Sequence, residues 1–224
     1  MSKRKKIFIT TIVLFVISVI FTLLVKVVDV DKIGPLGSAV GFSKLNLCFH
    51  NLTGYNDIFY DISKYLGLIP FMICAFYGLQ GIIQLIKNKS LKKIDKRLIF
   101  LGIFYVFMLA LYVAFDKIVI NYRPILEDGA LESSYPSSHT LLAVCICLSS
   151  LLISKYYIKN SVLRKYFNIL TWILMITLTV TRLLSGVHWL TDIIGGIIIS
   201  LFLVSLFYTF AYTEKKVKTK EDVI

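Results

Sequence analysis

The chain has 224 residues, of which 57% are hydrophobic and 17% charged, and its mean hydropathy is +0.78. This composition is far more apolar than that of a soluble domain, so it excludes that class and indicates a membrane protein. The formal net charge of +12 could suggest a nucleic-acid ligand. No nucleic-acid-binding motif accompanies the charge, and we expect no nucleic-acid partner.

Six apolar segments predict an all-α, polytopic membrane protein. Each is close to the length of about 20 residues with which a helix crosses the hydrocarbon core. The predicted transmembrane helices are Ile7–Val28, Tyr65–Ile86, Leu98–Ile120, Thr140–Ile158, Tyr166–Leu184 and Ile193–Tyr212. No internal repeat or linker separates them, so we interpret residues 1–224 as a single domain.

The first apolar run follows basic residues 3–6, as the core of a signal peptide would. The apolar core of a signal peptide has about 7 to 15 residues, whereas this run has about 20. No small-x-small cleavage site follows Leu24. We therefore expect a retained transmembrane helix.

Basic residues concentrate in alternate connections between the predicted helices. The N-terminal tail, segments 87–97 and 155–165, and the tail after Tyr212 hold most of the 25 basic residues but few of the 13 acidic ones. The positive-inside rule places these segments, and with them both termini, in the cytoplasm. The segment Asp29–Lys64 is rich in turn-forming residues, and we predict a long outer loop that partly covers the outer side as a lid.

Three short polar clusters lie on the predicted outer side. They are Lys117 with Arg123-Pro124, the run Pro136-Ser137-Ser138-His139, and Arg182 with His188 and Asp192. Ionisable residues at the edge of a membrane helix usually have a function or a paired partner. The guanidinium group suits phosphate oxygens, and lysine adds a point charge. The clusters therefore predict a pocket for phosphate.

The second cluster predicts the start of a helix. Ser137 or Ser138 is a natural N-cap behind Pro136, and the backbone N–H groups of a helix start favour an anion. An N-cap alone does not require His139, whereas a leaving oxygen requires a proton donor.

The third cluster places His188 and Asp192 four residues apart, on one helix face if the turn is regular. A carboxylate that accepts from one imidazole nitrogen leaves the other free as base, ligand or nucleophile. A metal site lacks a second acidic cluster nearby. A serine protease built on Ser137 would leave Arg123 and Arg182 without a role and has no G-x-S-x-G motif. We expect neither a metal nor a cofactor.

Taken in order, the three clusters resemble the phosphatidic acid phosphatase type 2 superfamily in its membrane-bound lipid phosphatase branch, whose soluble relatives include the vanadium-dependent haloperoxidases. The family pattern is a Lys followed by Arg-Pro, then Pro-Ser-Gly-His, then Ser-Arg with a His after five residues and an Asp after three more. Residues 117–192 carry this signature.

The sequence departs from the family pattern at three positions. Asp116 occupies the usual lysine position, and Lys117 follows one residue later, about 100° further around a helix. Ser138 replaces the family glycine but keeps its backbone N–H, and Thr181 replaces a serine but keeps a hydroxyl.

The resemblance implies a metal-independent phosphatase with a phosphohistidine intermediate. In that mechanism His188 attacks phosphorus, Asp192 orients His188, and His139 protonates the leaving oxygen. The groups implied to hold the phosphate oxygens are Arg123, Arg182, Ser137, the N–H of Ser138 and Lys117.

A site at the outer membrane face suits a lipid phosphate or diphosphate whose tail stays in the bilayer, and the sequence does not choose among such lipids. Two alternatives remain open: a lipid phosphotransferase with the same intermediate, and a non-catalytic relative that binds lipid phosphates. We expect an integral protein of a bacterial cytoplasmic membrane with the site facing outside. The sequence leaves the oligomeric state open.

Overall fold

We determined the fold from a computed structural model, which describes residues 3–127 and 129–212. Over these residues the chain is α-helical, with no β-strand beyond isolated bridges. The helices are α1 (Lys3–Val27), α2 (Ser43–Thr53), α3 (Asp57–Leu66), α4 (Ile69–Asn88), α5 (Lys96–Lys117), α6 (Ser138–Tyr157), α7 (Ser161–Leu184) and α8 (Leu190–Ala211). Short 3₁₀ turns occur at Pro35–Gly37 and Leu91–Lys93.

Six helical segments among the described residues are long and apolar enough to cross a membrane. Each contains or closely matches one of the predicted helices, so the prediction of an all-α protein with six transmembrane helices is confirmed. The second segment is longer than predicted, because α3 and α4 follow each other along Asp57–Asn88. A turn at Gly67 and Leu68 separates the two helices.

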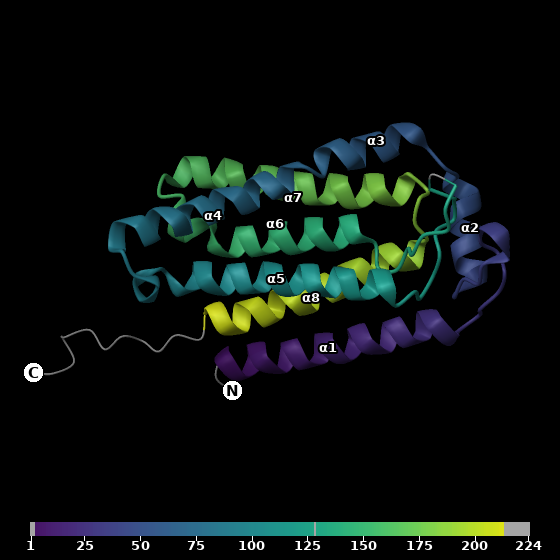
Figure 1. The fold of residues 1–224 in the computed structure, drawn as a ribbon, viewed down its shortest axis with the longest axis horizontal. Coiled ribbons are helices and arrows are strands. Elements are labelled where there is room, and N and C mark those ends of the chain that lie inside the picture. The colour runs from purple at the N-terminus through teal and green to yellow at the C-terminus, as the bar shows by residue number, and fades with distance from the viewer. Residues whose placement is uncertain (1–2, 128, 213–224) are drawn as a thin grey trace, which may run out of the picture.

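The segment Asp29–Lys64, predicted as a long outer loop, contains helices that its turn-forming residues did not indicate. Most of it forms α2 and the greater part of α3. The Asn56 side chain caps α3 by accepting a hydrogen bond of 3.1 Å from the Phe59 N–H. The turn formers therefore mark the connections before and between two helices. Figure 1 shows α2 at the end of the bundle and α3 beside α7, against which α3 packs.

Helix α6 forms the centre of the bundle (Figure 1). It packs against α4, α5, α7 and α8, and 61% of its most apolar window is buried. Its buried positions include small residues such as Ala143, Cys145 and Ser149. Small side chains let membrane helices approach closely, since packing rather than water exclusion holds them together. The N-terminus of α6, which carries the second polar cluster, is therefore held firmly.

Helix α1 lies at the edge of the bundle and packs mainly against α8. Most of its surface is exposed in the isolated chain, because only 11% of its apolar window is buried. Polar contacts also join the two helices: the Thr11 hydroxyl lies 2.7 Å from that of Ser205 and 3.0 Å from that of Thr209. This arrangement leaves the apolar residues of α1 to face lipid.

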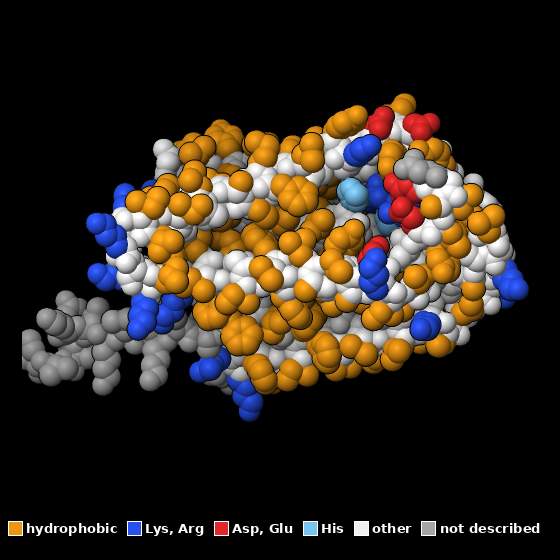
Figure 2. Space-filling model, in the orientation of Figure 1, with side chains coloured by type: hydrophobic (Ala, Val, Ile, Leu, Met, Phe, Trp, Pro, Cys, Tyr) orange, Lys and Arg blue, Asp and Glu red, His pale blue; other side chains and the backbone are white. Residues whose placement is uncertain are grey.

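The two ends of the bundle differ in charge. The start of α1 and the end of α8 lie at the same end in Figure 1, and the connections that carry the polar clusters lie at the other. In Figure 2, basic side chains gather at the first end, whereas the visible acidic side chains lie at the second end, together with some basic ones. The three polar clusters thus share one end, as the sequence predicted.

Candidate active site

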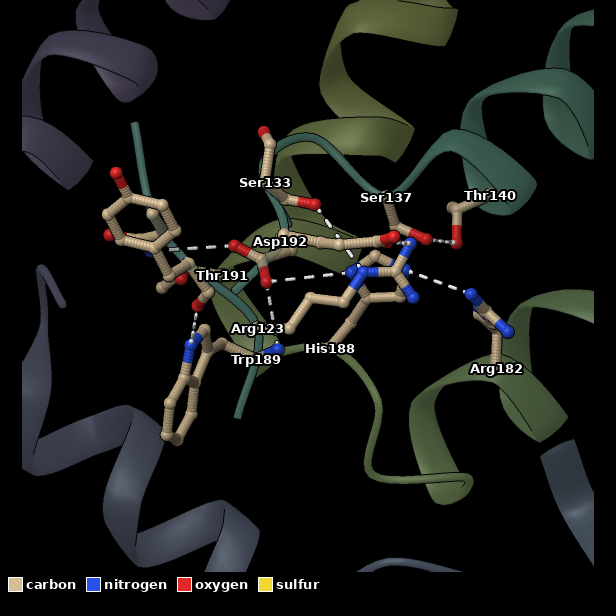
Figure 3. A network of polar contacts seen from close by, with 12 residues as sticks. Arg123, Ser133, Ser137, Thr140, Arg182, His188, Trp189, Thr191 and Asp192 are labelled. Carbon is tan, nitrogen blue, oxygen red and sulfur yellow. Dashed lines mark hydrogen bonds and ion pairs between the residues drawn. The ribbon is translucent and has the colours of Figure 1, made fainter. Parts of the chain in front are cut away.

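The predicted site residues come from four separate parts of the fold. Arg123 lies in the connection between α5 and α6, and Arg182 lies in the last turn of α7. His188 precedes α8, and Asp192 lies in its first turn. Figure 3 shows Arg123, Ser137, Arg182, His188 and Asp192 gathered into one group. These parts belong to three stretches of sequence, around Arg123, around Ser137 and over 182–192, which the fold brings together. Lys117 stays outside the group.

His188 and Asp192 do not lie on one helix face, because the regular turn on which that arrangement depended is not formed. Helix α7 ends at Leu184, and α8 begins only at Leu190. The turn between them contains Gly186 with a φ of +68°, where a Cβ atom would overlap the carbonyl group of Gly54. The turn nevertheless brings the His188 Nδ1 to 3.7 Å from the Asp192 Oδ2, with both side chains buried.

The Asp192 carboxylate is fixed by backbone and side-chain donors. Its Oδ2 accepts a 2.9 Å hydrogen bond from the Trp189 N–H, and its Oδ1 accepts one of 3.4 Å from the Asn121 amide. The Asn121 Oδ1 in turn accepts from the Gly41 N–H at 3.0 Å. The N-terminal end of a helix also favours a carboxylate. Asn121 was not predicted, because a single amide between apolar residues gives no recognisable signal.

The Nε2 atom of His188 faces Arg182, whose Nη2 lies 3.3 Å away. Burial lowers the pKa of His188 well below its ordinary value, and the positive charges of Arg182 and Arg123 lower it further. The imidazole is therefore neutral at pH 7. A proton on Nδ1, on the side of Asp192, leaves the lone pair of Nε2 available as a nucleophile.

Arg182 is a buried cation that has no acidic partner among the described residues. Arg182 is only 1% exposed. Its Nε atom has no hydrogen-bond partner in the described part of the chain. The ring of Tyr60 lies 5.5 Å from the guanidinium carbon. A buried charge is costly unless an opposite charge accompanies it. This environment is suited to a bound anion.

Arg123 has a different environment from Arg182. Its guanidinium forms ion pairs with Glu127 and, at 3.3 Å, with Glu132. The backbone N–H of Arg123 donates to the Glu132 carbonyl at 3.0 Å, which holds the residue on a tight connection. Glu127 also accepts a 3.0 Å hydrogen bond from the Tyr60 hydroxyl. Neither Glu127 nor Tyr60 was predicted as a site residue.

The cluster at the start of α6 takes the predicted position. Ser137 is the N-cap residue, although its side chain makes no capping hydrogen bond. Its hydroxyl instead accepts from Thr140 at 3.2 Å, and its N–H donates to the Asp192 carbonyl at 3.1 Å. The first N–H groups of a helix, which here include Ser138 and His139, have no acceptor within the helix. The buried Nδ1 of His139 also has no partner among the described residues.

Lys117 is not brought into the group. Its side chain is 78% exposed, and its ammonium pairs with Asp116 at 3.2 Å. Asp116, which occupies the usual lysine position, lines the cavity beside Arg123. The one-residue shift along α5 therefore turns Lys117 away, as the rotation of about 100° per residue requires.

Two neighbouring cavities meet at the start of α6. The first, of about 480 Å³, is lined by polar groups that include Arg123, Glu132, Ser138 and His188. The second, of about 380 Å³, has a mainly apolar lining. It includes His139 and Leu142 of α6 with Leu68, Phe71 and Leu109. Tyr112 and Ser138 line both cavities. Figure 2 shows histidine, basic and acidic side chains together in a hollow at this end of the molecule.

Among residues 3–127 and 129–212, no group of three or more His, Cys, Asp or Glu side chains is arranged to hold a metal ion. The cations Arg123 and Arg182, the imidazoles of His139 and His188, and the N-terminus of α6 can instead bind and act on an oxyanion.

Comparisons with known proteins support the predicted resemblance. Residues 115–216 match the family model of the PAP2 superfamily, and this range includes all three polar clusters. The fold is similar to the crystal structure of the first transmembrane PAP2 type phosphatidylglycerolphosphate phosphatase from Bacillus subtilis. The TM-score is 0.63 at 16% identity, over 93% of this chain and 99% of that one. A search of curated proteins finds no match.

Proposed function

Since residues 115–216 of this chain belong to the PAP2 superfamily, we propose that the protein is a metal-independent phosphatase of lipid phosphates or diphosphates. The observation that carries the proposal is the pair formed by His188 and Arg182. A neutral imidazole nitrogen lies 3.3 Å from a buried guanidinium that has no acidic partner among the described residues. A phosphate bound to Arg182 would therefore lie within reach of the His188 Nε2.

In the proposed reaction, the Nε2 of His188 forms a bond to phosphorus while the bond to the leaving oxygen breaks. His139 donates a proton to that oxygen, and Asp192 stabilises the positive charge that develops on His188. Water then attacks the phosphohistidine, with His139 accepting its proton, and phosphate is released. Arg123 and Arg182 hold the nonbridging oxygens, whose charge preorganised donors stabilise in the transition state.

The mainly apolar cavity beside His139 favours a lipid as the leaving group. Most of its lining comes from α4, α5, α6 and the turn before α4. Leu68 in that turn is 62% exposed and Phe71 of α4 is 50% exposed, on the flank of the bundle. In a membrane this flank faces lipid. A phosphate at the interface could thus bind the arginines while its apolar tail remained in the bilayer.

The distribution of charge supports a site on the outer face. The chain is an integral membrane protein, and its basic residues favour a cytoplasmic location for the end opposite the site. We propose that this membrane is the bacterial cytoplasmic membrane. Fusion of a reporter enzyme to each terminus, assayed for a cytoplasmic or external location, tests the orientation.

Phosphate release by the purified protein in detergent with EDTA tests the activity. The substrates are phosphatidate, phosphatidylglycerophosphate and undecaprenyl diphosphate, and His188→Ala is the control. We expect release without added metal and a loss of at least about 10³-fold in the variant, because the nucleophile is removed. Full activity of His188→Ala, or no release from any of these lipids by the unaltered protein, would contradict the proposal.

A further inference from the structure

Glu127 has no part in the reaction described above, yet it lies between the two arginines proposed to bind phosphate. Its carboxylate pairs with Arg123, whose side chain is only 12% exposed, and accepts from the Tyr60 hydroxyl at 3.0 Å. The Tyr60 ring lies over Arg182. A continuous set of contacts therefore runs from Arg123 through Glu127 and Tyr60 to Arg182.

A carboxylate offers a guanidinium the same kind of partner as a phosphate does, because both present two anionic oxygens to its N–H groups. The position that Glu127 occupies beside Arg123 is thus a position that an oxygen of the substrate would take. Arg182 differs, since no carboxylate of the described residues pairs with it. An incoming phosphate must displace an anion at one arginine and not at the other.

The backbone at Glu127 would permit such a displacement. Its N–H donates to the Ala130 carbonyl at 3.1 Å, and the Ala130 N–H donates back at 2.9 Å. These two bonds hold the main chain, so that Glu127 can leave Arg123 by rotation about its side-chain bonds. The Tyr60 hydrogen bond opposes this rotation and holds the carboxylate in place.

We propose that Glu127 competes with the substrate phosphate for Arg123 and that this competition sets which phosphates the site accepts. The inference rests on the proposed function, because it takes Arg123 as a phosphate ligand. A terminal phosphate, with up to two negative charges, gains enough from both arginines to displace the carboxylate. The phosphodiester of an ordinary membrane lipid carries one charge and two substituents, so it competes poorly.

The role proposed for Glu127 makes it a determinant of specificity for terminal phosphates over phosphodiesters. The membrane around the site contains phosphodiester lipids in large excess, and an unoccupied pair of arginines would bind them. Glu127 prevents this without blocking the intended substrate.

Titration calorimetry with inorganic phosphate, on the protein in detergent, measures the competition directly. In Glu127→Gln we expect phosphate to bind about tenfold more tightly, because the variant removes a charged hydrogen-bonded competitor. Glu132→Gln is the matched control. Glu132 also contacts Arg123, but its side chain is 45% exposed, and we expect a much smaller change. We further expect phosphatidylglycerol to inhibit hydrolysis by Glu127→Gln more strongly than by the unaltered protein.

Weaker or unchanged phosphate binding by Glu127→Gln would overturn the inference, since it would make Glu127 a structural clamp for Arg123. Tyr60→Phe provides an independent test if the first variant fails to fold. It keeps the ring over Arg182 but removes the bond to Glu127, and we expect binding to become about threefold tighter. If turnover depends on His188 but phosphate binding is unchanged in Glu127→Gln and Tyr60→Phe, only the inference is refuted. Absence of both turnover and phosphate binding would refute the proposed function as well.

Discussion

The site has two halves, one built on α7 and α8 and the other between α5 and α6. In the first half the arginine is buried, and no carboxylate of the described residues pairs with it. In the second half, two carboxylates pair with the arginine. Arg182 and His188 lie next to each other in the first half. In the second half, Arg123 pairs with Glu127 and Glu132. The first half is therefore ready for an anion before one arrives, and the second must exchange one anion for another.

This difference has a physical origin in how each half is built. Arg182 lies in the last turn of α7 and His188 in the short turn before α8, and both helices pack against α6. Their positions are therefore set before a substrate binds. Arg123 lies on the irregular connection between α5 and α6, where the carboxylates of Glu127 and Glu132 neutralise it. A preorganised cation contributes more to a transition state than one that must first release a partner. The contribution of each arginine to catalysis should therefore be unequal.

Replacing each arginine by lysine tests that inequality, and it should give the largest effect. We expect Arg182→Lys to lower kcat by about 10³-fold, because a lysine cannot reproduce the planar array of donors in the buried half. Arg123→Lys should cost about tenfold less, since part of the bonding of Arg123 goes to Glu127 and Glu132. The measurement is kcat on a phosphorylated lipid in detergent.

Thermal unfolding of both variants serves as the control, because a loss of fold would also remove activity. Equal losses of kcat in two well-folded variants would mean that the two arginines contribute equally to catalysis. That result would contradict the proposed difference between the two halves of the site.

His139 should contribute an effect that depends on the leaving group. We expect His139→Ala to lower kcat by about 10²-fold on a lipid phosphate, whose alkoxide needs a proton as it leaves. The loss should be small with p-nitrophenyl phosphate, because nitrophenolate leaves without protonation. Equal losses on both substrates would show that His139 binds the phosphate and does not act as the acid.

The protonation of His188 should differ from that of an exposed histidine. Because burial and the nearby arginines lower its pKa in the folded protein, the neutral form should persist as the pH falls below about 6.5, the ordinary value. Nitrogen chemical shifts of ¹⁵N-histidine-labelled protein, assigned with His50→Gln and His139→Gln, measure this. We expect no protonation of His188 near pH 6.5; a midpoint at or above that pH would contradict the environment described here.

The unfolded chain, by contrast, takes up a proton at His188 near pH 6.5. The contribution of this residue to stability is therefore present above that pH and decreases as the pH falls below it. Thermal unfolding should show a smaller loss on acidification in His188→Ala than in the unaltered protein.

The helices and most of the site could be predicted from the sequence because a lipid environment restricts the backbone conformations that a chain can adopt. Backbone groups in a bilayer must be satisfied within a helix, so long apolar runs have few alternatives. The same restriction makes Arg182, His188 and Asp192 conspicuous, because few ionisable residues occur near such runs. The local sequence therefore predicts the structure well in the segments that lipid surrounds, where few conformations are possible.

The outer segments were predicted less well because a chain in contact with water can adopt either a helix or a loop. The sequence of α3 contains polar residues that read as a loop, and its helical form depends on the Asn56 cap and on packing against α7. Tyr60 reaches the site only through that packing. Glu127 follows Arg123 by four residues, but in a segment without a predicted helix this spacing indicates no contact.

Lys117 provides the smallest expected effect. It matches the family lysine by residue type but lies one residue late, and its exposed ammonium pairs with Asp116. We expect Lys117→Ala to change kcat and KM by less than about twofold, because an exposed ion pair contributes little. Asp116→Asn is the variant to compare with Lys117→Ala, since Asp116 lines the cavity beside Arg123. We expect it to bind the substrate slightly more tightly, because a negative charge near the phosphate is removed. A large rise in KM for Lys117→Ala would instead mean that α5 unwinds at its end to bring the lysine to the phosphate, and the half of the site beside Arg123 would then contain a second cation.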